Sequence, residues 1–137
     1  MRNAEPTVVR FLNPTSMPPA FGYTQVVEVT GSKMLYIAGQ IAIDPAGQVV
    51  GAGDLRAQTR QVFENLKAGL EAVGTTFDYV VKLQFYLLDI TQIQVVRDVR
   101  DRYINTQFPP ASTAVEVRRL FRDEFLIEID AIAALPR

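Results

Sequence analysis

The sequence has 137 residues, of which 48% are apolar, and a formal net charge of −1 at pH 7. A chain of this length buries its core as one unit, so we expect a single domain over residues 1–137. The sequence pI of about 5.4 gives no electrostatic basis for binding nucleic acid. No run of about 20 apolar residues is present, so we expect no membrane span. Because no targeting signal is recognisable, the expected location is the cytoplasm.

The chain contains neither histidine nor cysteine. This composition excludes disulfides, thiolate chemistry, a Ser-His-Asp triad and imidazole metal ligands. Any catalysis must therefore use carboxylates, hydroxyls, Arg or Lys side chains, backbone groups and bound water. We see no metal-ligand cluster and expect no cofactor.

The first 50 residues favour irregular and β structure. Four prolines interrupt residues 1–20, which predicts an irregular arm with a short strand at 8–12. Residues 25–30 and 33–43 are predicted to be strands joined at Gly31-Ser32 into a hairpin. Gly39 interrupts the second strand, which indicates either a bulge or a close approach of the backbone to a ligand.

The middle of the chain favours two helices separated by a strand. Asp54 is a predicted N-cap, an apolar stripe at helical spacing follows, and Gly74 ends the helix. Residues 80–88 alternate as a strand, and a second helix of roughly 14 residues precedes Pro109. The order of elements predicts an α+β fold: a mostly antiparallel six-stranded sheet with two helices on one face. The other face needs cover, which favours an oligomer.

Two closing strands carry the candidate site. Alternation puts Ser112 and Ala114 on one face of the first strand, and its apolar valines on the other. We expect the valines to meet the helices, so that Ser112 and Ala114 share the helix-free face with Glu128 and Asp130. The two carboxylates are interpreted either as acid/base or water-positioning groups or as partners, at a subunit contact, of Arg118, Arg119, Arg122 or Lys82.

Two further residues, Tyr23 and Gly39, each allow a structural and a ligand-binding interpretation. Tyr23 follows a glycine in a loop, where its ring either covers a ligand or belongs to the core with its hydroxyl in water. Gly39 either forms a simple bulge or offers a backbone N–H to a ligand.

Several segments, taken in their order and spacing, resemble the RidA/YjgF family, also called endoribonuclease L-PSP. The resemblance covers about residue 20 to the end of the chain. The matching segments are Gly22-Tyr23-Thr24-Gln25, Ile37-Ala38-Gly39-Gln40-Ile41, Asp54 to Gly74, Val80-Val81-Lys82, Phe108-Pro109-Pro110-Ala111, Val115-Glu116-Val117 and Ile127-Glu128-Ile129-Asp130-Ala131-Ile132-Ala133.

The resemblance implies a chorismate-mutase-like fold and a homotrimer with small-molecule clefts between subunits. It implies hydrolysis of reactive enamines and imines with release of ammonia and without a cofactor. In that reaction an Arg holds the substrate carboxylate and a Glu positions water. The resemblance assigns the catalytic Glu to Glu128, and substrate contacts to Tyr23 and Gly39.

Ser112 stands where the family pattern has the carboxylate-binding Arg, with Ala114 on the same strand face lining the same pocket. A hydroxyl does not replace a permanently charged bidentate group. We therefore expect a hydrolase or deaminase with altered substrate choice that acts poorly on simple 2-imino acids. The alternative is a trimer that binds a metabolite without turnover, and we rank a ribonuclease below both.

Overall fold

The computed structural model describes residues 6–136, which form six strands and two α-helices as expected for the α+β class. The strands divide between a four-stranded sheet, in the order β3-β6-β4-β5, and a two-stranded ribbon of β1 and β2. The bounds are β1 Val8–Leu12, β2 Val26–Thr30, β3 Met34–Gln40, α1 Leu55–Ala72, β4 Val80–Leu87, α2 Ile93–Arg100, β5 Ala111–Glu116 and β6 Ile127–Ala134, with 3₁₀ turns η1 Phe77–Tyr79 and η2 Ile90–Gln92.

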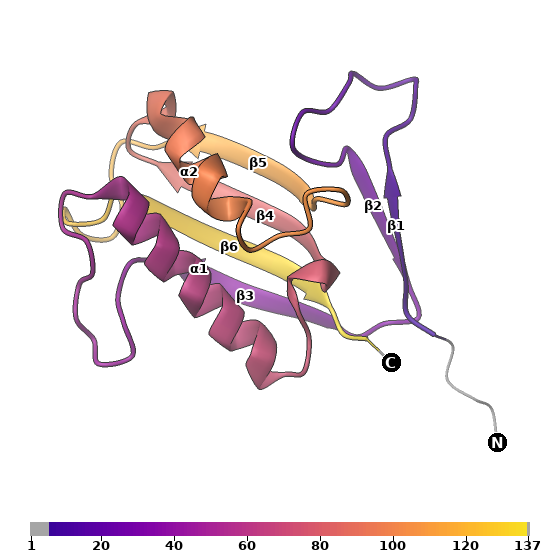
Figure 1. Cartoon of the computed structure of the whole chain (residues 1–137), viewed down its shortest axis with the longest axis horizontal. Helices are drawn as coiled ribbons and strands as arrows, with labels where there is room; N and C mark the ends of the chain where they lie inside the picture. The colour runs from indigo at the N-terminus through magenta and orange to yellow at the C-terminus, as the bar shows by residue number, and fades with distance from the viewer. Residues whose placement is uncertain (1–5, 137) are drawn as a thin grey trace.

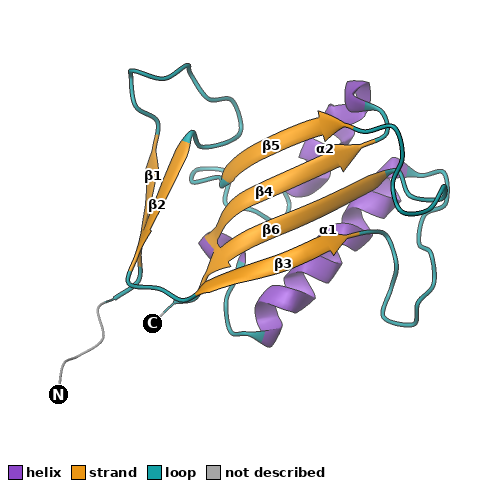
Figure 2. Ribbon diagram, turned by 180° about the vertical axis from the view of Figure 1, so that it is seen from behind, coloured by secondary structure: helices purple, strands orange, loops and turns teal. Residues whose placement is uncertain are grey.

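The four-stranded sheet has two different edges. Strands β3 and β4 pair with β6 in antiparallel fashion, whereas β4 and β5 run parallel, so β3 and β5 are the outer strands. Both helices cover one face of this sheet, with α1 over β3 and β6 and α2 over β4 and β5 (Figure 1). The opposite face has no helix over it, and the β1-β2 ribbon projects to one side (Figure 2).

Helix α1 begins and ends as its sequence predicts. The Asp54 side chain accepts a hydrogen bond from Ala57 N at 3.1 Å, which satisfies one of the free N–H groups of the first turn. Gly74 adopts a positive φ of 79° after the last turn, and Thr75 N donates to Leu70 O. Between these ends, the apolar side chains Val62, Phe63, Leu66 and Leu70 are buried on the face that packs against β3 and β6.

The second helix is shorter than predicted. Instead of roughly 14 residues, α2 has 8, preceded by the 3₁₀ turn η2. Asp89 accepts from Thr91 N at 3.0 Å and caps this tighter turn. After Arg100 the chain tightens again, since Tyr103 N bonds Arg100 O three residues back.

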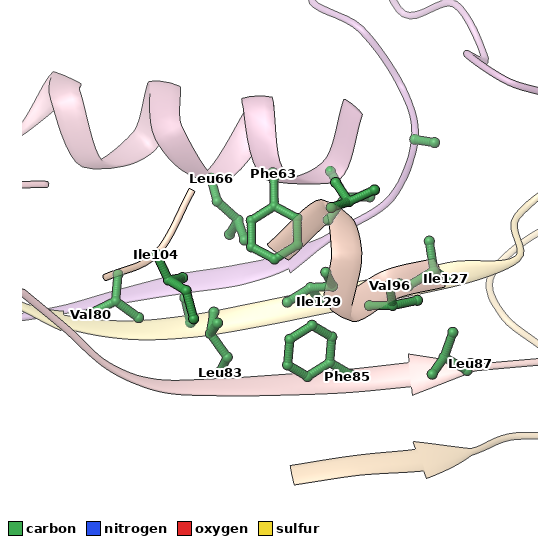
Figure 3. Close-up of a cluster of buried hydrophobic side chains, with 14 of the residues drawn as sticks. Phe63, Leu66, Val80, Leu83, Phe85, Leu87, Val96, Ile104, Ile127 and Ile129 are labelled. Atoms are coloured by element: carbon green, nitrogen blue, oxygen red, sulfur yellow. The ribbon is translucent and has the colours of Figure 1, made fainter. Parts of the chain in front are cut away.

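The core lies between the helices and the sheet, and Figure 3 shows its centre. Phe63 and Leu66 of α1 are fully buried against Leu83 and Phe85 of β4 and Ile129 of β6. Burying a side chain of this size contributes about 1.5–3 kcal/mol. This packing fixes which residues of β4 and β6 point toward the helices, and it therefore sets the two faces of the sheet.

The predicted hairpin between residues 25–30 and 33–43 is wrong, because β2 pairs with β1 and β3 pairs with β6. The Ser32 hydroxyl donates to Leu135 O and accepts from Leu135 N, each at 2.9 Å. These bonds, together with the positive φ of 70° at Gly31, turn the chain from the ribbon into the main sheet. Gly31-Ser32 is thus a connection between two sheets.

Candidate active site

A pocket of about 120 Å³ lies between the edge strand β5 and helix α2. It combines hydroxyl groups, two guanidinium-bearing side chains and an apolar floor. The described residues that line it are Tyr23, Phe85, Ile93, Val96, Arg97, Arg100, Ser112 and Ala114. Three of the side chains expected to bind substrate, Tyr23, Ser112 and Ala114, are therefore brought together here.

Tyr23 reaches the pocket because its loop is tied to the start of β5. The buried Thr24 donates its backbone N–H to Pro110 O at 3.1 Å, and its hydroxyl donates to Pro109 O. Gly22 turns the chain with a positive φ of 76°, a conformation that favours glycine. These features hold a loop from the N-terminal part of the chain beside Ser112.

The predicted face of Ser112 and Ala114 is wrong. Ser112 pairs with Leu83 and Ala114 with Phe85, so both lie on the helix-covered face of the sheet. Thr113 points the other way, where its hydroxyl accepts from Lys82 Nζ at 2.9 Å. The prediction assumed that the valines of this strand face the core. Val115 is instead 40% exposed, because β5 is an edge strand of mostly small side chains.

Sequence reasoning missed the two arginines of α2. Arg97 and Arg100 line the pocket with Ile93 and Val96. The four positions follow the i, i+3, i+4, i+7 pattern of one helix face, which is the signal that could have found them. Arg100 is largely buried, and its Nε and Nη2 donate to Asp101 Oδ1 at 3.0 and 2.9 Å.

Gly39 and Glu128 form a second feature, on the other side of the sheet. A Cβ added to Gly39 would lie 2.8 Å from Glu128 Cδ and would overlap Oε2, so only glycine leaves room for this carboxylate. The ladder between β3 and β6 is irregular between Ile37 and Gln40, so the predicted bulge is present at this point.

The electrostatic surroundings of Glu128 favour its protonated form. Partial burial and the neighbouring charge of Asp130 raise the pKa of Glu128. Burial and the Asp130 and Glu128 carboxylates likewise raise the pKa of Tyr86, which pairs with Glu128 across the β4-β6 ladder. A carboxyl group with a raised pKa can exchange protons nearer neutral pH than an ordinary Glu.

One chain cannot bring Glu128 to the pocket. Glu128 shares the helix-free face with Tyr86, whereas Ser112 shares the helix-covered face with Leu83. Strand β4 also lies between β6 and β5, which separates them by about 10 Å. The predicted common surface for Ser112 and Glu128 therefore does not exist within one chain.

Residues 6–136 contain no cluster of three or more acidic side chains placed to hold a metal ion. Within the same range, no helix has the length and apolarity that a membrane crossing needs.

Comparison with known proteins decides the family. The family model described as Endoribonuclease L-PSP matches residues 14–135. The chain belongs to this family. The chorismate-mutase-like fold expected from the resemblance to RidA/YjgF proteins is confirmed by the solved structures of Rid-family members.

Three relatives illustrate the family. The chain is 44% identical over 117 residues to Protein DfrA of Myxococcus xanthus, covering 85% of this chain and 88% of that protein. It is 33% identical over 125 residues to the human 2-iminobutanoate/2-iminopropanoate deaminase, covering 90% and 88%. The Rid-family protein YyfB of Yersinia pestis superposes with a TM-score of 0.82 at 35% identity, covering 93% of this chain and 98% of that one.

Proposed function

We propose that this L-PSP-family protein is a hydrolase that releases ammonia from a small enamine or imine, with a substrate choice shifted from that of the family's deaminases. The observation that carries the proposal is the pocket in which Tyr23, Ser112 and Ala114 meet. The deaminase names of the human and goat relatives support the reaction class.

The proposed reaction adds water to the C=N carbon of an imine, and the resulting carbinolamine loses ammonia to leave a carbonyl compound. Glu128 takes one proton from the attacking water and passes it to the imine nitrogen, which forms the carbinolamine. It then takes the proton of the carbinolamine hydroxyl and gives it to the nitrogen, which leaves as ammonia, and its raised pKa suits both transfers. The hydroxyls of Tyr23 and Ser112 orient the substrate. Gly39 provides the space in which the Glu128 carboxylate lies.

We infer that Glu128 acts on the pocket of a neighbouring copy. The pocket lies at the β5 edge of the sheet, while Gly39 lies on β3, the opposite edge. Contacts between unlike edges are head-to-tail, and a head-to-tail contact gives a closed ring when the rotation between copies closes. A homotrimer of this kind also covers the helix-free face, where Tyr36 is 73% exposed. Light scattering should give about three times the 15.3 kDa chain mass, and a single-chain mass would contradict the trimer.

The test of the reaction is release of ammonia from a panel of enamines and imines generated in situ, beginning with 2-iminobutanoate. Wild-type protein should accelerate loss of at least one member, and Glu128→Gln should reduce that rate by about 10²-fold or more. If Glu128→Gln hydrolyses every accepted substrate at the wild-type rate, the assigned role of Glu128 is wrong.

A metabolite-binding protein without turnover is the second candidate. It is favoured by Ser112, which provides only a neutral group where the family resemblance expects Arg. Saturable binding of an imine or ketone without any ammonia release across the panel would favour this candidate.

A further inference from the structure

We propose that Arg97 of α2 supplies the positive charge of the pocket and binds the carboxylate of its ligand. The guanidinium would then enter from the helix wall, whereas Ser112 occupies the strand wall. The proposal rests on the proposed function only for the identity of the substrate, since binding of a carboxylate is measurable without turnover.

The two arginines in the pocket differ in the contacts that their guanidinium groups make. Arg100 already has protein partners. Its side chain is 9% exposed, and two of its nitrogens donate hydrogen bonds to Asp101. It also lies under the Gly22 turn, where an added Cβ would be 3.1 Å from Nη2. Arg100 therefore supports the Tyr23 loop, and its charge is largely compensated by Asp101.

Arg97 is in a different state. It is only half-buried, and within residues 6–136 no carboxylate oxygen lies within 4 Å of its guanidinium. The neighbouring Asp98 bonds Gln94 at 2.9 Å and lies 3.7 Å from Arg56. Since Asp98 and Asp101 contact other groups, the N–H groups of the Arg97 guanidinium remain available to a ligand.

The wall of the pocket combines positive charge with hydroxyl groups. None of the eight described lining residues is acidic, and Tyr23 and Ser112 add hydroxyl groups near the arginines. A guanidinium with a planar fork of donors matches a carboxylate in a bidentate way, and a partly desolvated site strengthens that contact. The pocket thus favours an anion over a neutral or cationic ligand.

The pocket is small. The volume of about 120 Å³ is well below the roughly 300–1,000 Å³ of pockets for drug-sized molecules. The part of the site that one chain forms therefore suits a ligand of few heavy atoms, such as a three- or four-carbon carboxylic acid. Because the charge comes from the helix side, the carboxylate is held in a different orientation from one bound at position 112. This difference is a physical reason for altered substrate choice.

The experiment measures binding of 2-oxobutanoate, a stable keto acid, by calorimetry to the full-length protein. Its uncharged isostere 2-oxobutanamide is measured in parallel. Wild type should prefer the acid over the amide by tenfold or more, the range expected for a charged bidentate contact. Arg97→Gln should lose that preference, and Arg97→Lys should keep part of it. The control Arg102→Gln removes the same charge from an exposed residue outside the pocket and should bind as wild type does.

The acid/amide ratio separates ligand binding from a merely structural role, because loss of folding would weaken both ligands together. The proposal is overturned if Arg97→Gln retains the wild-type ratio, if wild type shows no preference for the acid, or if Arg102→Gln lowers the ratio equally. If the proposed hydrolysis is wrong but the role of Arg97 is right, the acid binds through Arg97 and no imine is hydrolysed. Conversely, imine hydrolysis at equal rates by wild type and Arg97→Gln would leave the reaction standing and remove Arg97 from it.

Discussion

Glu128 lies directly over Gly39, so the carboxylate on β6 occupies the space that a side chain on β3 would fill. The two residues are 89 positions apart in the sequence, and the ladder between β3 and β6 places them together. Because Gly39 has no positive φ, its requirement for glycine is one of space and not of backbone conformation.

The first prediction follows from this contact. Gly39→Ala should lower the rate of ammonia release by about tenfold or more, because the new Cβ displaces the Glu128 carboxylate from its position. The displaced atoms are the far end of a flexible side chain, so the free energy of unfolding should change by less than about 1.5 kcal/mol. Steady-state kinetics and urea unfolding measure the two effects.

Gly69→Ala is the matched control. Gly69 lies inside α1, and the atom nearest to an added Cβ is Ile37 Cδ1 at 3.7 Å, an ordinary contact. This variant should be stabilised by up to about 1 kcal/mol and keep full activity. Equal loss of activity in both variants would contradict the special role of the Gly39–Glu128 contact.

The second prediction concerns pH. The pKa of Glu128 is higher in the folded protein than in the unfolded chain, so the unfolded state loses its proton first as pH rises. The contribution of Glu128 to the free energy of unfolding therefore falls as pH rises from the ordinary Glu pKa, about 4.3, through the raised pKa of the folded protein. Glu128→Gln removes this penalty and should be more stable than wild type at pH 7. The advantage should shrink as pH falls through that window toward 3.5.

Urea unfolding at both pH values measures this difference. An advantage of Glu128→Gln that stays the same at pH 3.5 and pH 7 would show that the ionisation of Glu128 does not cause it. Asp130→Asn gives a second check, because removal of the neighbouring charge should bring the pKa of Glu128 down.

The third prediction concerns the loop that carries Tyr23. Thr24→Val removes the hydroxyl that bonds Pro109 O and leaves that carbonyl without its partner. We expect a loss of stability of about 1–3 kcal/mol and weaker ligand binding, because the loop is no longer tied to β5 at this point. Thr30→Val, an exposed change on β2, should alter neither property. Unchanged ligand affinity in Thr24→Val would contradict the anchoring role.

The sequence predicted the helices and strands because their apolar periodicity is strong, as in α1 and β4. It predicted the face of Glu128 and Asp130 correctly, since β6 is central and alternates between fully buried and partly exposed residues. It failed at Ser112, because the edge strand β5 lacks such alternation. It also failed to pair β2 with β1 and to place Arg97 in the pocket. Those relationships depend on contacts between segments distant in the sequence.

The fourth prediction concerns the buried Gln58 of α1, which holds the loop at Gly51 and the chain just before β6. The fully buried Gln58 donates to Gly51 O at 3.1 Å and Glu124 O at 2.7 Å, and accepts from Leu126 N at 2.8 Å. Gln58→Leu leaves all three groups unpaired and should reduce the free energy of unfolding by roughly 3 kcal/mol or more. Gln94→Leu loses one exposed bond to Asp98 and should cost only about 0.5 kcal/mol. Similar losses in the two variants would contradict this account.

The most direct test of the account is complementation between two inactive chains. Ala114→Phe fills the pocket and Glu128→Gln removes the proposed catalytic group, so each variant alone should hydrolyse the accepted substrate at least about 10²-fold more slowly than wild type. Unfolded together in equal amounts and refolded, they should recover roughly a quarter of wild-type activity, because about one site in four joins an intact pocket to a neighbour's intact Glu128. No activity in the refolded mixture would contradict a site shared between copies.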